Sequence, residues 1–274
     1  MINTIDFLNY LLPVLYLGAF SVYLYNFISE KKNFEHSKRL ALFITLLVHC
    51  IYLAMRTFEF NHPPITNRYE IFTVLAFSIT CSYFLLELLT DIRGTGLFIL
   101  PFALVFQAIS SLYITESYVV KDVLRNNLLG LHVMSALLGY AGFTISAVHG
   151  VLFLMLYKKL KGSNFGLIFK KMPSLETLEK LSFSSVVIGF TLLTIAILIG
   201  GFWLPSAFPN FKYSDPKLIS SALIWTIYAI GILIKYLGGW YGRKVINTTL
   251  LGFALTLLSL LLINVLGSSF HTFS

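Results

Sequence analysis

The sequence predicts an all-α, polytopic membrane protein, an eight-helix transmembrane bundle with both chain ends on the outer side of the membrane. Of its 274 residues 57% are hydrophobic and only 12% are charged, and the mean hydropathy of +0.81 lies far above the range of soluble globular proteins. Long apolar runs recur along the whole chain, and no segment is long enough for a separate soluble domain. We therefore expect residues 1–274 to form a single transmembrane domain.

Eight apolar runs, each bounded by charged residues or by Pro and Gly, are long enough to cross a bilayer. The first run has neither the positive flank nor the small-residue cleavage site of a signal peptide, so we expect it to be retained as a helix. The predicted spans are residues 5–29, 40–57, 70–89, 96–113, 127–157, 183–204, 218–237 and 248–268.

The distribution of basic residues predicts the orientation of these spans. When alternate connections are assigned to opposite sides, one side receives 14 of the 20 Lys and Arg residues. The positive-inside rule places that side in the cytoplasm. The net charge of +8 then reflects membrane orientation and contact with membrane lipid, and we expect no nucleic-acid partner.

The longest inner connection, residues 158–183, contains Pro173-Ser174-Leu175-Glu176, a typical helix start. We expect a short helix that lies on the inner membrane surface. The alternative is an ordinary basic connector that touches lipid headgroups.

Few residues offer chemistry inside the membrane. Cys50 and Cys81 are isolated, so the residues for thiol exchange, zinc binding or covalent heme attachment are missing. No nucleophile is accompanied by a base and an orienting group, so we expect no catalytic residue and no enzyme. The polar residues His49, Gln107 and Asn264 are too few to favour a small-molecule transporter.

Three of the six histidines, His62, His132 and His271, fall on the predicted outer side. His132 lies on a stripe of small residues along the fifth span and is therefore expected to face the bundle interior. Two inward imidazoles from different helices can supply both axial ligands of a heme iron, whereas a single helical histidine is commonly a hydrogen-bonded packing residue. The stripe consists of Ser135, Gly139, Gly142, Ser146 and Gly150.

The outer connection at residues 200–217 is short and aromatic. Its aromatic rings are candidates for stacking on a porphyrin, and Lys212 or Lys217 for pairing with porphyrin propionates. The alternative is an interfacial aromatic belt with snorkelling lysines. The aromatic candidates are Trp203, Phe208, Phe211 and Tyr213.

Several motifs, in this order, resemble the cytochrome c assembly proteins, the group that includes CcsA, CcmC and HemX-like proteins. The resemblance covers nearly the whole chain and is firmest over residues 128–271. The motifs are Asn61-His62-Pro63-Pro64-Ile65-Thr66-Asn67-Arg68-Tyr69-Glu70, Leu131-His132-Val133 with Leu138-Gly139-Tyr140-Ala141, Asp215-Pro216-Lys217, Gly239-Trp240-Tyr241-Gly242-Arg243 and Phe270-His271.

The resemblance implies a multi-pass protein of the bacterial cytoplasmic membrane that handles heme during cytochrome c maturation. It implies that a non-covalent, b-type heme is held at the outer face, with His132 and His271 as ligands of the iron. It further implies cofactor contacts from the outer connection, a CcsB-like membrane partner and an apocytochrome c that receives the heme. The implied contacts are Trp203, Phe211, Tyr213 and Asp215.

The chain departs from the family in the outer loop, where residues 208–218 lack all three tryptophans of the family's tryptophan-rich motif. This loop looks more like the HemX-like branch, which is tied to control of early tetrapyrrole synthesis. The alternative function is therefore a membrane regulator that acts through the basic inner connections. The sequence assigns no role to His49, His62 or His149.

Overall fold

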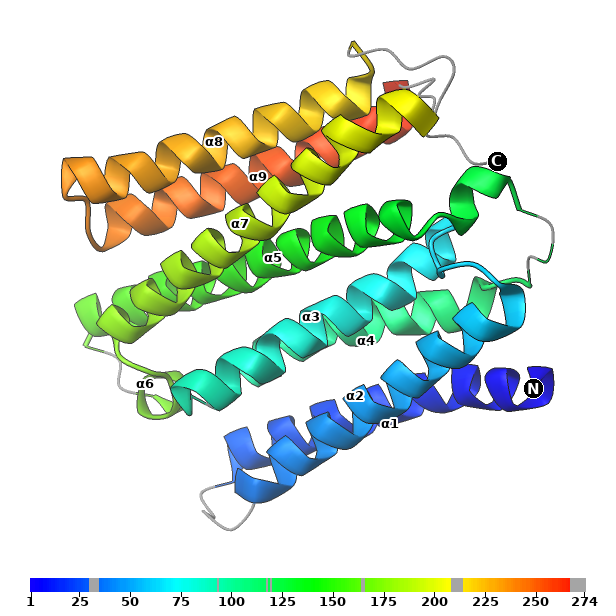
Figure 1. Cartoon of the computed structure of the whole chain (residues 1–274). Helices are drawn as coiled ribbons and strands as arrows, with labels where there is room; N and C mark the ends of the chain where they lie inside the picture. The colour runs from blue at the N-terminus through cyan, green and yellow to red at the C-terminus, as the bar shows by residue number, and fades with distance from the viewer. Residues whose placement is uncertain are drawn as a thin grey trace. The chain divides into compact units, whose positions relative to one another are not determined.

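The computed structural model describes residues 1–29, 35–92, 94–116, 118, 120–163, 166–207 and 214–266. Within these ranges the regular elements are helices, as the sequence predicts (Figure 1). The elements are α1 (Ile2–Ile28), α2 (Glu35–Phe60), α3 (Arg68–Thr90), α4 (Gly96–Tyr113), the 3-10 helix η2 (Asp122–Arg125), α5 (Asn127–Lys161), α6 (Leu167–Lys171), α7 (Leu175–Ala207), α8 (Pro216–Gly238) and α9 (Arg243–Leu266).

In the part of the chain that the structure describes, seven helices are long and apolar enough to cross a membrane: α1 to α5, α7 and α8. The protein is therefore a multi-pass membrane protein, and the all-α prediction is confirmed. The eighth predicted span corresponds to α9. The predicted span at residues 96–113 coincides with α4, and the largest difference is at the start of α7, predicted at residue 183 and observed at Leu175.

The prediction of a separate surface helix after Pro173 was wrong. Leu175 begins α7, which continues without interruption to Ala207, and the short helix α6 precedes that start. The Ser174 side chain caps α7, because its Oγ accepts a hydrogen bond from the Thr177 N–H at 3.2 Å. No Pro or Gly stands between Leu175 and residue 188, so nothing in the sequence ends the helix before it enters the membrane.

Two compact units divide the chain, residues 1–130 and residues 131–274. In the first unit α1 packs against α2 and α4, and α3 packs against α2 and α4, which gives a four-helix bundle (Figure 1). The division falls close to residue 128, where the most family-like part of the sequence begins. The single transmembrane domain over residues 1–274 stays a prediction.

The interior of the first unit holds a hydrogen-bonded polar network centred on His49. The Tyr16 Oη lies 2.8 Å from His49 Nδ1, and the Thr73 Oγ1 lies 2.9 Å from His49 Nε2. Because the Thr73 hydroxyl donates to the Gln107 Oε1 at 2.7 Å, it accepts from the imidazole, and His49 Nδ1 accepts from Tyr16. Both ring nitrogens of His49 are therefore used in joining the four helices of this unit.

The connection between α2 and α3 closes one end of the first unit. The Asn67 side chain caps α3 by accepting from two backbone N–H groups, at 3.0 and 2.9 Å. The buried Glu70 carboxylate pairs with Arg56 at 2.9 Å and accepts from the Thr66 hydroxyl at 2.7 Å. His62 is also buried, with its Nδ1 2.9 Å from the next backbone carbonyl. This family-like segment thus has a structural role as a helix start.

In the second unit α5 and α7 pack backbone to backbone through the predicted small-residue stripe. A Cβ added at Gly142 would lie 2.9 Å from the Gly189 Cα, and one at Gly139 would lie 3.0 Å from the Gly189 carbonyl oxygen. One turn further along, the Ser146 and Ser182 hydroxyls lie 3.1 Å apart. Small residues permit this close approach of membrane helices, so the interior orientation of the stripe is confirmed.

A Gly142→Ala substitution is expected to destabilise the protein by about 1–3 kcal/mol, because the new methyl group meets backbone that has no room to move. Gly18→Ala is the matched control: Gly18 also lies inside a helix, and a Cβ there meets nothing within 4 Å. The midpoint of thermal unfolding in detergent measures the change in stability of both variants. Equal midpoints for the two variants would contradict the packing of α5 on α7.

Candidate functional site

The second unit contains a cavity of about 570 Å³ between α5, α7 and α8. Its walls are formed by His132, Ala136 and Tyr140 of α5, by residues of α7 between Leu193 and Gly201, and by residues of α8 between Lys217 and Ala222. Most of these side chains are apolar. The size and the few polar groups are typical of a small-molecule site.

His132 lies in the second turn of α5 and binds the backbone of α7. Its Nδ1 is 2.7 Å from the Ala196 carbonyl oxygen. A carbonyl oxygen only accepts, so Nδ1 carries the proton and donates it. The neutral imidazole then keeps the lone pair of Nε2 for another partner. Metal-binding histidines are commonly oriented by such a hydrogen bond from the opposite ring nitrogen.

Gly200 makes room for this imidazole. It lies one turn after Ala196 on α7, and a helical side chain leans over the turn that precedes it. A Cβ at Gly200 would lie 2.8 Å from the His132 Cε1 and 3.0 Å from its Nδ1. Any larger residue at this position would displace the ring. Sequence reasoning assigned no role to Gly200, because a glycine one turn beyond a carbonyl indicates such an approach only once the bonded carbonyl is known.

The family-like Asp215-Pro216-Lys217 segment starts α8. The Asp215 side chain is the N-cap: its Oδ1 accepts from the Lys217 N–H at 2.8 Å, and Pro216 occupies the first helical position. Asp215 is buried, and Lys217 is half-buried on the cavity wall. The cap therefore fixes the backbone position of Lys217 at the cavity wall. A direct contact between Asp215 and a ligand stays a prediction.

The connection between α7 and α8 begins later than predicted. It was given as residues 200–217, after a span that ended at residue 204, but α7 continues to Ala207 and includes Pro205, so both limits were wrong. Within a bilayer the backbone must satisfy its own hydrogen bonds, which favours a continued helix over an early loop. Trp203 therefore lies half-buried in the last turns of α7, and it is not among the described residues that line the cavity.

The other predicted ligand contacts lie outside the described residues. These are Phe208, Phe211, Lys212 and Tyr213 in residues 208–213, and His271 in residues 267–274. The described part of α9 ends at Leu266, at the end of the second unit where α7 ends and α8 begins (Figure 1). The pairing of His132 with His271 therefore stays a prediction.

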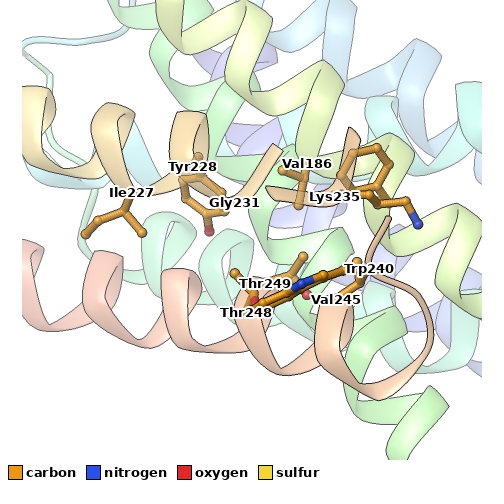
Figure 2. A pocket seen from close by; sticks show the side chains of 10 residues that line it. Val186, Ile227, Tyr228, Gly231, Lys235, Trp240, Val245, Thr248 and Thr249 are labelled. Carbon is orange, nitrogen blue, oxygen red and sulfur yellow. The ribbon is translucent and has the colours of Figure 1, made fainter. Parts of the chain in front are cut away.

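A smaller pocket lies near the connection between α8 and α9 (Figure 2). Its volume of about 20 Å³ has room for about one water molecule. Beside it, the Glu179 carboxylate pairs with Lys235 at 2.7 Å and accepts from the Gly242 N–H at 2.8 Å. Gly239 and Gly242 have positive φ angles of 59° and 62°, which favour glycine. The family-like segment at residues 239–243 is thus a tight, anchored turn, and the pocket is too small for a cofactor.

Comparison with known proteins agrees with the sequence resemblance. A family described as "Cytochrome C assembly protein" matches residues 9–271, a range that covers most of both units and includes His132 and His271. Similar proteins include "Cytochrome c biogenesis protein CcsA" of Mesostigma viride, which is 28% identical over an alignment of 256 residues that covers 85% of this chain and 84% of the relative. Proteins of the same description from Pyropia yezoensis and Guillardia theta are 28% and 26% identical, over 86% and 99% of this chain and 87% and 95% of the relatives.

Proposed function

The chain belongs to the cytochrome c assembly protein family, and from this premise we propose that it holds heme at the outer face of the membrane and presents it to an apocytochrome c. The observation that carries the proposal is the hydrogen bond from His132 Nδ1 to the Ala196 carbonyl, on the wall of a cavity of ligand size. That hydrogen bond keeps the proton of the neutral ring on Nδ1, so Nε2 keeps the lone pair that can bind iron.

The residues of the cavity fit heme. Apolar side chains from three helices suit the porphyrin body, the imidazole of His132 suits the iron, and Lys217 is a basic residue among the described lining. Because Gly200 has no side chain, the imidazole of His132 fits against α7 and reaches the Ala196 carbonyl. When bound, heme would supply the iron that His132 holds, and the thioether chemistry would belong to the heme and to the thiols of the apocytochrome. The role of this chain is to bind and orient.

His271 is proposed as the second ligand of the iron. It follows the end of α9 by five residues, so a short segment separates it from the end of the unit that carries His132. Without a CxxCH motif the chain has no site for covalent attachment, which favours a non-covalent, b-type heme. We place the protein in the bacterial cytoplasmic membrane, with a CcsB-like membrane partner.

Deletion of the gene in the source organism tests this function. We expect c-type cytochromes, detected by heme staining of denaturing gels, to be lost, to return with the wild-type gene and to stay absent with a His132→Ala gene that is expressed to the same level. The alternative, a HemX-like regulator, is favoured by the missing tryptophans of residues 208–218. It predicts intact c-type cytochromes and an altered level of the early tetrapyrrole enzyme, and that result would overturn the proposal.

A further inference from the structure

The positive charge of the chain is concentrated at one end of the second unit, where α5 ends and α7 begins and where α8 ends and α9 begins (Figure 1). Residues 157–182 and 235–244, which form this end, carry nine basic and two acidic residues. In the first unit, residues 29–39 and 87–93, which are predicted to lie on the same side of the membrane, carry five basic and four acidic residues. The positive-inside rule accounts for the side of the membrane. It does not explain why nearly all of the excess charge belongs to one unit.

Contacts within the second unit join these two segments into one surface, which we call the basic end. The Glu179 carboxylate accepts from Lys235 Nζ at 2.7 Å and from the Gly242 N–H at 2.8 Å, so one of the two acidic residues is bound to the protein itself. The Arg243 guanidinium, at the start of α9, lies 5.0 Å from the centroid of the Tyr157 ring, at the end of α5. The basic residues of the two segments are therefore neighbours in space.

The start of α9 is the part of the basic end that most favours an anion. Arg243 and Lys244 are its first two residues, and both are exposed. The first turn of α9, all of which the structure describes, contains no acidic residue. Because a helix N-terminus carries partial positive charge, two cations there are unfavourable unless an anion lies beside them. Aromatic rings hold both cations in place, since Lys244 Nζ also lies 5.8 Å from the centroid of the Trp240 ring.

We propose that the basic end binds the phosphate groups of anionic phospholipids, with Arg243 and Lys244 at its centre. Guanidinium groups bind phosphate through two parallel hydrogen bonds, and clusters of basic residues beside membrane helices are typical of sites for anionic lipids. Trp240 and the exposed Tyr241 are the residue types that lie at the level of lipid headgroups. Acyl chains of the same lipid would cover exposed apolar side chains such as Leu237.

An acidic segment of another protein offers similar charge, but the position of the two cations favours lipid. Arg243 and Lys244 follow the end of α8 by five and six residues, and α8 is long and apolar enough to cross the membrane. Long basic side chains so close to a membrane helix reach the headgroup layer. A soluble partner would have to compete there with the lipid phosphates that are already present.

The test titrates the delipidated full-length protein in detergent with phosphatidylglycerol and with phosphatidylcholine of identical acyl chains, and counts bound lipid by native mass spectrometry. We expect phosphatidylglycerol to bind at least about fivefold more tightly, the effect of one basic residue beside an anionic membrane surface. An Arg243→Gln/Lys244→Gln protein should lose most of this preference. Lys121→Gln/Arg125→Gln removes the same charge from two exposed residues of the first unit and should keep the preference.

Two further measurements separate lipid binding from effects on the fold. Lys244→Gln alone leaves the contact between Arg243 and Tyr157 in place and should lose part of the preference, and higher ionic strength should weaken it in the wild type. Equal binding of the two lipids by the wild type would overturn the inference. So would an unchanged preference in the variants of Arg243 and Lys244, or an equal loss in the Lys121→Gln/Arg125→Gln control.

Discussion

A Gly200→Ala variant is expected to lose the low-spin heme spectrum and to bind heme at least about tenfold more weakly, on the scale of other changes that disturb the orientation of a metal ligand. The added methyl carbon would lie 2.8 Å from the His132 Cε1 and 3.0 Å from Nδ1, so the imidazole must move away from the Ala196 carbonyl. The methyl group meets a side chain and not rigid backbone, and the fold should therefore survive the change.

Gly18→Ala is the control for this prediction. It makes the same change inside a helix of the other unit, and a Cβ there meets nothing within 4 Å. Absorbance spectra of the two purified variants with ferric and ferrous heme provide the measurement, with size-exclusion chromatography as the check on folding. If both variants keep the wild-type spectrum, the contact between Gly200 and His132 has no part in heme binding.

A His132→Gly variant is expected to show the largest loss of heme affinity, at least about a hundredfold, because it removes the ligand itself and not only its orientation. Imidazole added to the buffer should restore a six-coordinate, low-spin spectrum by entering the space that the side chain leaves. A heme titration with and without imidazole measures both effects.

His36→Ala is the control histidine, because His36 is exposed at the start of α2 in the other unit and should leave heme binding unchanged. A His132→Gly protein that binds heme as tightly as the wild type would remove His132 from the site. Failure of imidazole to restore the spectrum in a folded variant would argue that the histidine acts only in packing.

Most of the fold follows from the length of the apolar runs and from the residues that bound them. The limits of α4 coincide with the prediction because Thr95-Gly96 and the polar residues after Tyr113 bound its apolar run. The start of α7 was placed eight residues too late, because the amphipathic residues 175–182 are too polar for a hydropathy pattern yet continue the helix. The stripe through Gly139 and Gly142 was predictable because helical periodicity alone places small residues on one face.

The candidate site was predictable only in part. The stripe placed His132 in the bundle interior, but its partner Ala196 is a backbone carbonyl 64 residues away, which no side-chain pattern marks. Gly200 acquires its role only from the position of that imidazole. The ligand contact predicted for Asp215 stays a prediction, and its role as the cap of α8 appeared only in the structure. The hydrogen bonds of the two His49 ring nitrogens likewise depend on helices that are distant in sequence.

Low-temperature electron paramagnetic resonance of the ferric heme complex tests the central claim most directly. For the wild-type protein the account predicts a low-spin signal with the g values of two axial imidazoles. That signal should be replaced by a high-spin signal in His132→Ala and in His271→Ala and should be retained in His36→Ala. A low-spin signal that is unchanged in His132→Ala, or wild-type protein that binds no heme, would contradict the account.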